Sequence, residues 1–375
     1  MPRTHVAPRQ DTLRTVSDQK LLPTARETLT IGFDIGGTNM RAGVVDSQGK
    51  ILRAASLRTP DTEAGMDAGI HDLVSRLRKD FEVDAVGLAV AGFLDPECEV
   101  VRFAPHLPWR DAPVRQHLSE ILSLPVRLEH DANSAAWGEY TYGAARGVED
   151  WVLLAVGTGI GATIMSKGEI FRGAYGTAPE FGHLPVVPGG RRCPCGKRGC
   201  LERYCSGTAL VETLKELAES CRFCTGPLIA QLREDPSQVN GAMVTEAAAE
   251  GDPLGVAAVE EFAYWLGEAL AIVADVIDPE LIVLGGGVSR AADLYLDRAR
   301  AYFSERIVGA GHRPLAKIAT ADLGADAGMI GVADLARRLV RAEAESTSPS
   351  SARVGVGVSA AAPITGPTQE TPHAE

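Results

Sequence analysis

Short apolar runs that end at glycine-rich turns set the pattern of this chain. The run at 29–33 meets such a turn, and the segment 85–90 (AVGLAV) has no polar interruption. Runs bounded by turn residues predict strands, and an unbroken run predicts a strand buried on both faces. Further strands are predicted at 42–45, 51–54, 126–129 and 152–156. Because strands meet glycine turns at both Phe33 and Val156, the pattern hints at a duplicated half.

The clearest helical periodicity lies at 260–278, where apolar side chains recur at spacings of three and four residues. Asp278 and Pro279 end this helix, because the residue before a proline disfavours the helical conformation. The segment 280–284 (ELIVL) predicts a buried strand that runs into three consecutive glycines. Shorter helices are predicted at 64–79 and 328–339.

Length, composition and charge exclude several classes of protein. The 375 residues suffice for two lobes of roughly 150 residues each, which disfavours a single small binding module. The net charge of −12 disfavours binding to a nucleic-acid backbone, which needs a basic surface. Without an apolar stretch of ~18 residues or the apolar core of a signal peptide, a cytoplasmic protein is expected. Polar or Ser/Pro/Gly-rich composition predicts a disordered arm at 1–27 and a disordered tail at 343–375.

Two glycine turns carry the first candidate chemistry. In the segment 34–38 (DIGGT) the glycines let backbone N–H groups line a concave anion site, although glycine pairs also make plain hairpins. The Asp can hold Mg²⁺ through water and the Thr hydroxyl can reach a phosphate, as phosphoryl transfer requires. The segment 157–161 (GTGIG) repeats the device, and two facing turns would clamp a triphosphate. The candidate residues are Asp34, Gly36, Gly37, Thr38, Gly157, Thr158 and Gly159.

Other phosphate-binding motifs fit less well. Neither turn ends in the Gly-Lys-Ser/Thr of a Walker loop. The glycine spacing at 157–161 differs from a Rossmann fingerprint, and a strand is expected after it where a dinucleotide site needs a helix. A dehydrogenase is therefore disfavoured.

Asp131 is the candidate catalytic group. It lies between the strand predicted at 126–129 and a helix, where an Asp is most often only an N-cap. Beside two phosphate turns it can instead orient a sugar hydroxyl and accept its proton, because phosphoryl transfer asks more for positioning than for a strong base. The interpretation is a kinase with Asp131 as its general base.

A cysteine cluster predicts a structural metal. Cys193, Cys195 and Cys200 lie in a polar loop shortly after His183, a donor set typical of a closed Cys₃His zinc site. With four protein ligands no position is left for water, and the second ring nitrogen of His183 stays available to a ligand hydroxyl. The remaining cysteines are expected to be reduced and without a special role: Cys98, Cys205, Cys221 and Cys224.

Taken together, the motifs resemble the ROK family (repressors, open reading frames and kinases), particularly its bacterial glucokinases. The matching segments are 34–43 (DIGGTNMRAG), 87–95 (GLAVAGFLD), 129–139 (EHDANSAAWGE), 156–162 (VGTGIGA), 179–202 (PEFGH followed by CPCGKRGCLE) and 278–289 (DPELIVLGGGVS). The resemblance implies an α/β, actin-like (ribonuclease H-like) fold of two lobes with a zinc-stabilised loop at 179–202. The small lobe would comprise 28–130, with a C-terminal helix at 325–342 returning to it, and the large lobe 131–324.

The resemblance also implies a function and its residues. It implies ATP-dependent phosphorylation of the 6-hydroxyl of glucose or a close hexose, with Mg²⁺, a structural Zn²⁺ and Asp131 as base. A homodimer or homotetramer without nucleic-acid or membrane partners is implied as well. The sugar ligands would be Gly92, His130, Asn133, Glu180, His183 and Glu202, and the nucleotide side would gain Asn39, Gly285, Gly286 and Gly287.

Three departures from the family pattern keep alternatives open. His130 replaces a usual Asn, which leaves the preferred sugar open, and Asn39 replaces a frequent Lys, which leaves ATP or polyphosphate as donor. Pro179 stands where Gly is common. An N-acylmannosamine kinase would share every motif. A sugar-responsive repressor would need a helix-turn-helix before Asp34, where the sequence is too short and irregular for one, and a catalytically dead sugar-binding protein should lack Asp131 or a phosphate turn.

Overall fold

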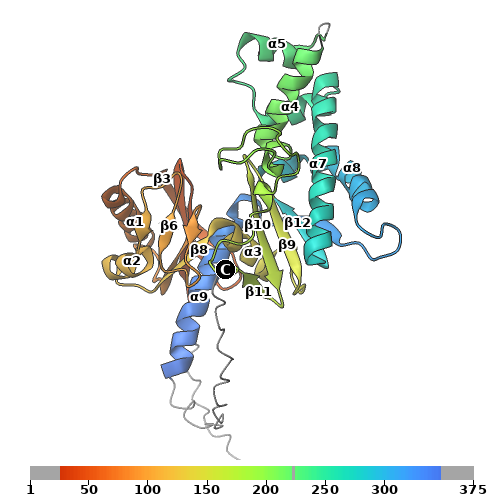
Figure 1. Cartoon of the computed structure of the whole chain (residues 1–375). Helices are drawn as coiled ribbons and strands as arrows, with labels where there is room; N and C mark the ends of the chain where they lie inside the picture. The colour runs from red at the N-terminus through yellow and green to blue at the C-terminus, as the bar shows by residue number, and fades with distance from the viewer. Residues whose placement is uncertain (1–25, 222–223, 348–375) are drawn as a thin grey trace, which may run out of the picture.

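The computed structural model describes residues 26–221 and 224–347. Residues 1–25 of the predicted arm and residues 348–375 of the predicted tail lie outside the described residues. Residues 343–347, which were assigned to the tail, instead complete the helix α9 (Ala327–Thr347). The described chain forms two lobes, each built of helices around a sheet (Figure 1).

The two five-stranded sheets have the same topology. Their strand orders are β3-β2-β1-β4-β8 and β11-β10-β9-β12-β13. In each order the first three strands pair antiparallel and the last three pair parallel. This repetition agrees with the duplication that the glycine turns suggested. The strands are β1 (Thr30–Ile35), β2 (Asn39–Val45), β3 (Ile51–Arg58), β4 (Ala85–Val90), β8 (Val126–His130), β9 (Trp151–Val156), β10 (Ile160–Ser166), β11 (Glu169–Phe171), β12 (Leu281–Gly285) and β13 (Lys317–Thr320), with a small separate sheet of β5 (Phe93–Leu94), β6 (Val101–Phe103) and β7 (Arg110–Ala112).

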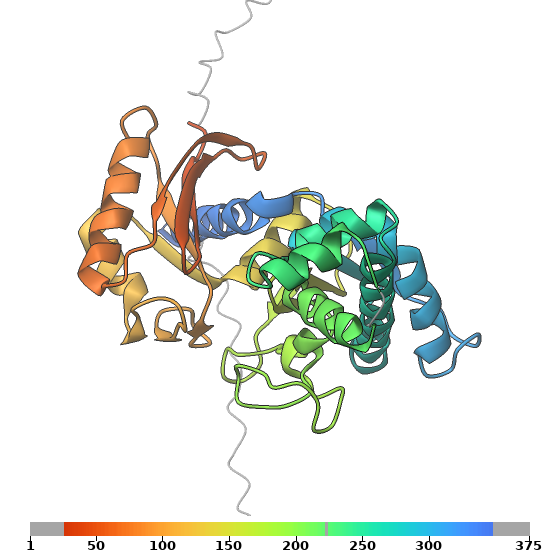
Figure 2. The same cartoon turned by 90° about the horizontal axis from the view of Figure 1, so that it is seen from above.

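The helices divide between the two sheets. The first lobe has α1 and α2 beside its sheet, and the second carries the group α4 to α8 (Figures 1 and 2). Helix α3 connects the lobes in sequence. The remaining bounds are α1 (Glu63–Leu77), α2 (Val114–Leu122), α3 (Asp131–Tyr142), α4 (Gly207–Ser220), α5 (Pro227–Glu234), α6 (Gly241–Ala249), α7 (Pro253–Ile277) and α8 (Ala292–Arg306).

The unbroken apolar strands are buried on both faces because alternate side chains enter different cores. Val152 and Leu154 of β9 belong to the core formed with α4 to α8. Trp151 and Leu153 belong to a separate core formed with Ala136 and Trp137 of α3. Since successive side chains of a strand point to opposite faces, both faces must be apolar. Helix α3 therefore covers one face of the second sheet, and α4 to α8 cover the other.

Helix α9 packs between the first sheet and α3 (Figure 2). A Cβ at Gly32 of β1 or at Gly87 of β4 would overlap backbone carbonyl groups of α9. On its other side, a Cβ at Gly331 would overlap the carbonyl oxygen of Ser134 in α3. Only glycine permits backbones to approach so closely. The last helix is thus held by direct backbone contact to both neighbours.

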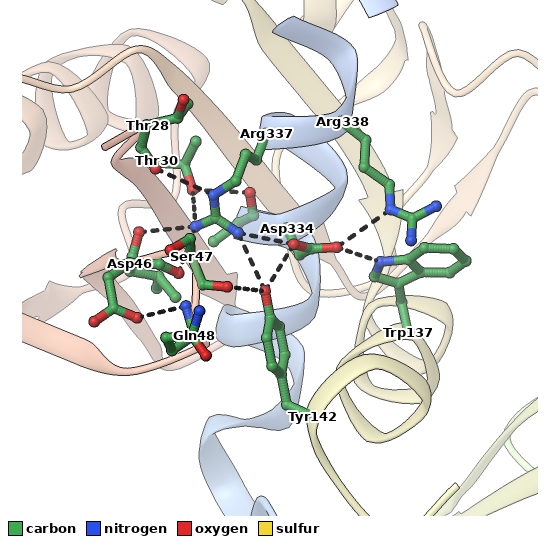
Figure 3. A network of polar contacts seen from close by, with 12 residues as sticks. Thr28, Thr30, Asp46, Ser47, Gln48, Trp137, Tyr142, Asp334, Arg337 and Arg338 are labelled. Atoms are coloured by element: carbon green, nitrogen blue, oxygen red, sulfur yellow. Dashed lines mark hydrogen bonds and ion pairs between the residues drawn. The ribbon is translucent and has the colours of Figure 1, made fainter. Parts of the chain in front are cut away.

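A buried ion pair fastens α9 to the first strands (Figure 3). The side chain of Arg337 is 1% exposed and its Nη1 donates to Oδ1 of Asp334 at 2.8 Å. Its Nη2 donates to Oγ1 of Thr30 at 3.1 Å. Asp334 also accepts hydrogen bonds from Tyr142 Oη at 2.8 Å and Trp137 Nε1 at 3.0 Å. Burial alone would raise the pKa of Asp334, but these donors and the guanidinium lower it overall.

Two expectations about the second lobe need correction. Helix α7 starts at Pro253, before the predicted 260, because Asp252 caps it by accepting from the N–H groups of Leu254 and Gly255. Asp278 ends it in the left-handed conformation, close to where the sequence indicated. Cys221 and Cys224, expected to be reduced and without a special role, form a disulfide at the end of α4. None of the described helices has the length and apolar character needed to cross a membrane.

Candidate active site

A cavity of about 1330 Å³ opens in the second lobe. Its lining includes Gly157 and Thr158 of the second glycine turn and Gly287 of the triple glycine. The N-terminal ends of α4, at Gly207, and of α6, at Gly241, line it as well. Helix N-termini present N–H groups and a partial positive charge, which suit an anionic ligand. These two helix ends were not among the predicted site residues, although Ser206 and Asn240 are recognisable N-cap residues just before them.

Hydrogen bonds fix the second glycine turn to α4. The N–H of Gly207 donates to the carbonyl of Gly157 at 2.8 Å. The hydroxyl of Thr208 donates to the carbonyl of Thr158 at 2.8 Å. Gly286 has a φ of +80° and backs onto the end of β9, where a Cβ would overlap the backbone. Of the predicted nucleotide-side residues in this lobe, Gly157, Thr158 and Gly287 line the cavity, whereas Gly159, Gly285 and Gly286 do not.

Glu202 lies against the same turn. Its Oε2 accepts the N–H of Ile160 at 2.9 Å, and a Cβ at Gly159 would overlap the carboxylate. Close approach of Glu202 therefore explains the glycine at 159. The predicted sugar ligand uses one oxygen to join the loop 179–202 to the second phosphate turn.

The first glycine turn follows β1 and is shaped by a neighbouring loop. A Cβ at Gly37 would lie 2.6 Å from the Cβ of His106, so the turn needs glycine for space. Gly36 accepts a hydrogen bond from Thr59 Oγ1 at 2.6 Å through its carbonyl. This turn does not line the 1330 Å³ cavity, because it belongs to the other lobe. Gly37, Thr38 and Asn39 are exposed.

Asp34 stands at the end of β1, where charges from both lobes meet. Burial raises the pKa of Asp34, and the negative charge of Asp131 raises it further. Arg41, whose Nη1 lies 4.0 Å from Oδ2 of Asp34, acts in the opposite direction. The structure therefore brings the carboxylate of the first turn near the candidate catalytic carboxylate.

A smaller pocket lies where the lobes meet. Four of the predicted sugar ligands, Gly92, His130, Asn133 and Glu180, line it together. The other residues of its lining are Phe93, Ala162, Gly176, Thr177, Ala178 and Pro179. His183 and Glu202 are outside this lining.

Asp131 begins α3 beside this pocket. Its Oδ1 accepts the N–H of Ala132 at 2.7 Å and lies 3.3 Å from Nδ1 of His130. Within the described part of the chain, its Oδ2 has no hydrogen-bond partner, and its side chain is 44% exposed. The carboxylate is thus fixed through one oxygen while the other is open to a ligand.

Several predicted site residues influence the pKa of Glu180. Burial raises its pKa, and the imidazoles of His183 and His130 oppose that effect. Glu202 and Asp131 raise the pKa of Glu180 again through their negative charges. Glu180 and these four other predicted site residues therefore lie close enough together to influence one another electrostatically.

The predicted zinc ligands are gathered at one point. The ligand atoms of His183, Cys193, Cys195 and Cys200 all lie within 4.8 Å of one another. Sγ of Cys193 is 3.6 Å from Nδ1 of His183, and Sγ of Cys195 is 3.7 Å from Sγ of Cys200. Sulfurs around a tetrahedral Zn²⁺ lie ~3.8 Å apart, given Zn–S bonds of about 2.3 Å, so the donor set fits zinc. The other ring nitrogen of His183, Nε2, does not face the sulfurs and lies 4.0 Å from Oε2 of Glu180.

A buried acid, Glu129, contacts the pocket residue Asn133 and was not among the predicted site residues. Asn133 donates to Oε1 of Glu129 at 3.0 Å and accepts from the hydroxyl of Thr163 at 3.0 Å. The side-chain amide of Asn133, a predicted sugar ligand, therefore already uses hydrogen bonds to Glu129 and Thr163. Arg172 bonds to Glu129 as well. Glu129 opens the matching segment 129–139, but no sequence signal assigns a role to it or to Arg172.

Comparison with known proteins identifies the family. The sequence model of the ROK family matches residues 30–339. The chain belongs to the ROK family. A glucokinase of Streptomyces coelicolor is 40% identical over 309 residues, which cover 82% of this chain and 98% of that enzyme. The crystal structure of a ROK family glucokinase from Streptomyces griseus, in complex with glucose and AMPPNP, superposes with a TM-score of 0.74 at 41% identity and covers 83% of this chain and 99% of the other.

The ROK family also includes regulators related to this chain. A xylose repressor of Caldicellulosiruptor bescii is 31% identical over 286 residues, which cover 74% of this chain and 70% of the repressor. The predicted family and the actin-like ROK sugar kinase fold are confirmed. The relatives also bear out the prediction of a sugar kinase.

Proposed function

We propose that this ROK sugar kinase transfers the γ-phosphoryl group of ATP to the 6-hydroxyl of glucose or a close hexose, with Asp131 as the general base. The observation that carries the proposal is the position of Asp131. Its carboxylate starts α3 beside the pocket lined by His130 and Glu180 and lies near enough to Asp34 to raise the pKa of Asp34. Sugar, base and phosphate turn would therefore meet at one point between the lobes.

The roles of the groups follow from this arrangement. Oδ2 of Asp131 would accept the proton of the attacking hydroxyl, while the bond from Ala132 and the proximity of His130 orient the carboxylate. The N–H groups of the second glycine turn and the N-termini of α4 and α6 would hold the phosphates, and the 1330 Å³ cavity has room for the adenosine. Asp34 would hold Mg²⁺ through water, and the ion would neutralise phosphate charge.

We also propose that His183, Cys193, Cys195 and Cys200 hold one structural Zn²⁺. All four positions of a tetrahedral ion would be taken by protein, so the metal would supply folding energy and no reactive water. With Nδ1 of His183 on the metal, its Nε2 would donate to a sugar hydroxyl beside Glu180.

Glucose is the favoured substrate because the relatives of about 40% identity are glucokinases, one of them crystallised with glucose and AMPPNP. An N-acylmannosamine kinase is the main alternative, because His130 changes the polar groups offered to the ring hydroxyls. A sugar-responsive regulator is the alternative outside enzymes and is motivated by the related xylose repressor.

A coupled kinase assay tests the proposal. Glucose, mannose, fructose, N-acetylglucosamine and N-acetylmannosamine would be compared, each with ATP and with polyphosphate as donor. Asp131→Ala should lower kcat on the best sugar by at least ~10²-fold, the usual effect of losing acid–base help. Asp72→Ala, an exposed carboxylate change on α1, is the control and should keep wild-type kcat. Sugar binding without turnover in the wild type would favour the regulator, and near-normal kcat in Asp131→Ala would reject the base.

A further inference from the structure

Glu129 is an ionised side chain with no exposure to solvent, although it touches neither candidate substrate pocket. Its Oε1 accepts from Asn133 Nδ2 at 3.0 Å and from the N–H of His130 at 3.1 Å. Its Oε2 accepts from the guanidinium groups of Arg127, at 2.9 Å, and of Arg172. Burial alone would raise the pKa of Glu129, but its donors lower it. Both oxygens of this charged carboxylate are therefore hydrogen-bonded, and one of them contacts the candidate catalytic segment at His130 and Asn133.

The two arginines come from different lobes. Arg127 lies on β8, two residues before Glu129, so this ion pair stays within one strand. Arg172 follows β11 of the second sheet and reaches Glu129 across the space between the lobes. Glu129 is therefore bound by its own lobe through one guanidinium and by the opposite lobe through the other.

Arg172 also marks the start of the loop 173–180, which forms one wall of the small pocket. The N–H of Ala178 donates to the carbonyl of Arg172 at 3.1 Å, so the backbone of this arginine is hydrogen-bonded to the far end of the loop. The loop then lies against the first lobe, where a Cβ at Gly176 would meet the backbone of Leu94 at 2.7 Å. Four pocket residues, Gly176 to Pro179, thus depend on the placement of Arg172.

We propose that the ion pair between Glu129 and Arg172 is an interlobe latch that positions loop 173–180 against the segment 130–133 and thereby sets the affinity for the sugar. The inference rests on the proposed sugar site and extends it to two residues that do not touch the ligand. The latch joins the two walls of the pocket at a single carboxylate. Charge-assisted hydrogen bonds are stronger and more directional than neutral ones, which suits a positioning role.

Arg127 provides a matched control for Arg172. The two side chains are 23% and 22% exposed, and both bond through Nη2 to the same oxygen, Oε2 of Glu129. Replacing either one by Met removes one positive charge from the same acid. Of the two changes, only the one at 172 removes a contact from the opposite lobe. If Glu129 needed the two positive charges only for the stability of the fold, both variants would affect the protein to the same extent.

The experiment measures KM for sugar, KM for ATP and kcat for wild type, Arg127→Met and Arg172→Met, together with sugar binding by calorimetry. Arg172→Met should raise the sugar KM and dissociation constant by about ten- to a hundredfold, as expected for a lost charge-assisted bond. Its KM for ATP should stay within about twofold, since Arg172 does not line the nucleotide cavity. Arg127→Met should leave the sugar KM within about threefold. Arg172→Lys, which keeps the charge, should recover part of the affinity.

The outcomes separate the latch from the proposed function. Equal sugar KM in Arg127→Met and Arg172→Met would overturn the latch. So would a fall in kcat of Arg172→Met with unchanged sugar affinity. If Arg172→Met does not fold, Arg172→Lys carries the test against Arg127→Lys, and its sugar KM must be the higher of the two. If the wild type phosphorylates no sugar, the proposed function fails, and calorimetry with sugar still decides whether the latch governs binding.

Discussion

Replacement of Arg337 by Met tests how the last helix holds the first lobe. The buried guanidinium bonds to Asp334 and to Thr30, and it also donates to three backbone carbonyls (Figure 3). Met keeps an unbranched apolar stem but removes the charge and all these donors. The carbonyls are those of Thr28 at 3.2 Å, Val45 at 2.9 Å and Asp46 at 2.7 Å.

The expected loss is about 3–5 kcal/mol in the free energy of unfolding, because Asp334 loses its buried counter-charge. Trp137 and Tyr142 still bond to Asp334, which favours the lower end of this range. The pKa of Asp334 is lowered in the folded state. Its ion pair therefore contributes fully above the ordinary value of 3.8 and is lost as pH falls through the lowered pKa. The difference between variant and wild type should shrink below pH 3.8.

Urea unfolding followed by circular dichroism measures this difference, with Arg338→Met as the control. Arg338 is the next residue, 55% exposed, and its Nε lies 3.4 Å from Oδ2 of the same Asp334. Exposed ion pairs contribute about 0–1 kcal/mol, so the control should lose little. If Arg337→Met is no less stable than Arg338→Met, the buried pair does not hold the helix as we infer.

Three further predictions concern the site. Asp34→Asn should abolish phosphoryl transfer yet raise the free energy of unfolding at pH 7, because a carboxylate with a raised folded-state pKa begins to destabilise the fold as pH rises above the ordinary value of 3.8 and does so fully above the raised pKa; a stability gain that does not grow between pH 3 and 7 would contradict this. Cys195→Ser should lower bound zinc below one per chain and lower the melting temperature, and elemental analysis without zinc in the wild type would reject the site. His130→Asn should shift kcat/KM ratios among glucose, mannose and N-acetylmannosamine by about ten- to a hundredfold, and unchanged ratios would remove His130 from the sugar site.

Much of the architecture could be predicted because its signals are local. Apolar runs that end in glycine turns mark β1 and β9, and three cysteines in a polar loop indicate the group of metal-ligand side chains that the structure gathers with His183. The periodicity predicts helix α7 but begins it too late, because its first turns are set by the N-cap Asp252.

The remainder depends on contacts between distant segments. Nothing in the composition around Arg172 shows that it reaches Glu129, 43 residues earlier in the chain. The reason for glycine at 159 is likewise nonlocal, since it is the carboxylate of Glu202 that fills the space. The disulfide between Cys221 and Cys224 could not be predicted, because no further ligand or pattern around these residues assigns them a role.

The packing of α9 on β1 and β4 has a consequence for the order of folding. The hydroxyl of Thr30 donates to the carbonyl of Ala333, a contact that spans 303 positions of the chain. Until residues 327–340 have been synthesised, one face of the first sheet lacks the helix that covers it, with Gly32 and Gly87 offering no side chains in its place. Contacts of such separation close slowly, because a long loop must be ordered first. The first lobe to be made should therefore be the last to reach its native state, and during synthesis the sheet face beneath α9 is the surface most in need of protection from aggregation.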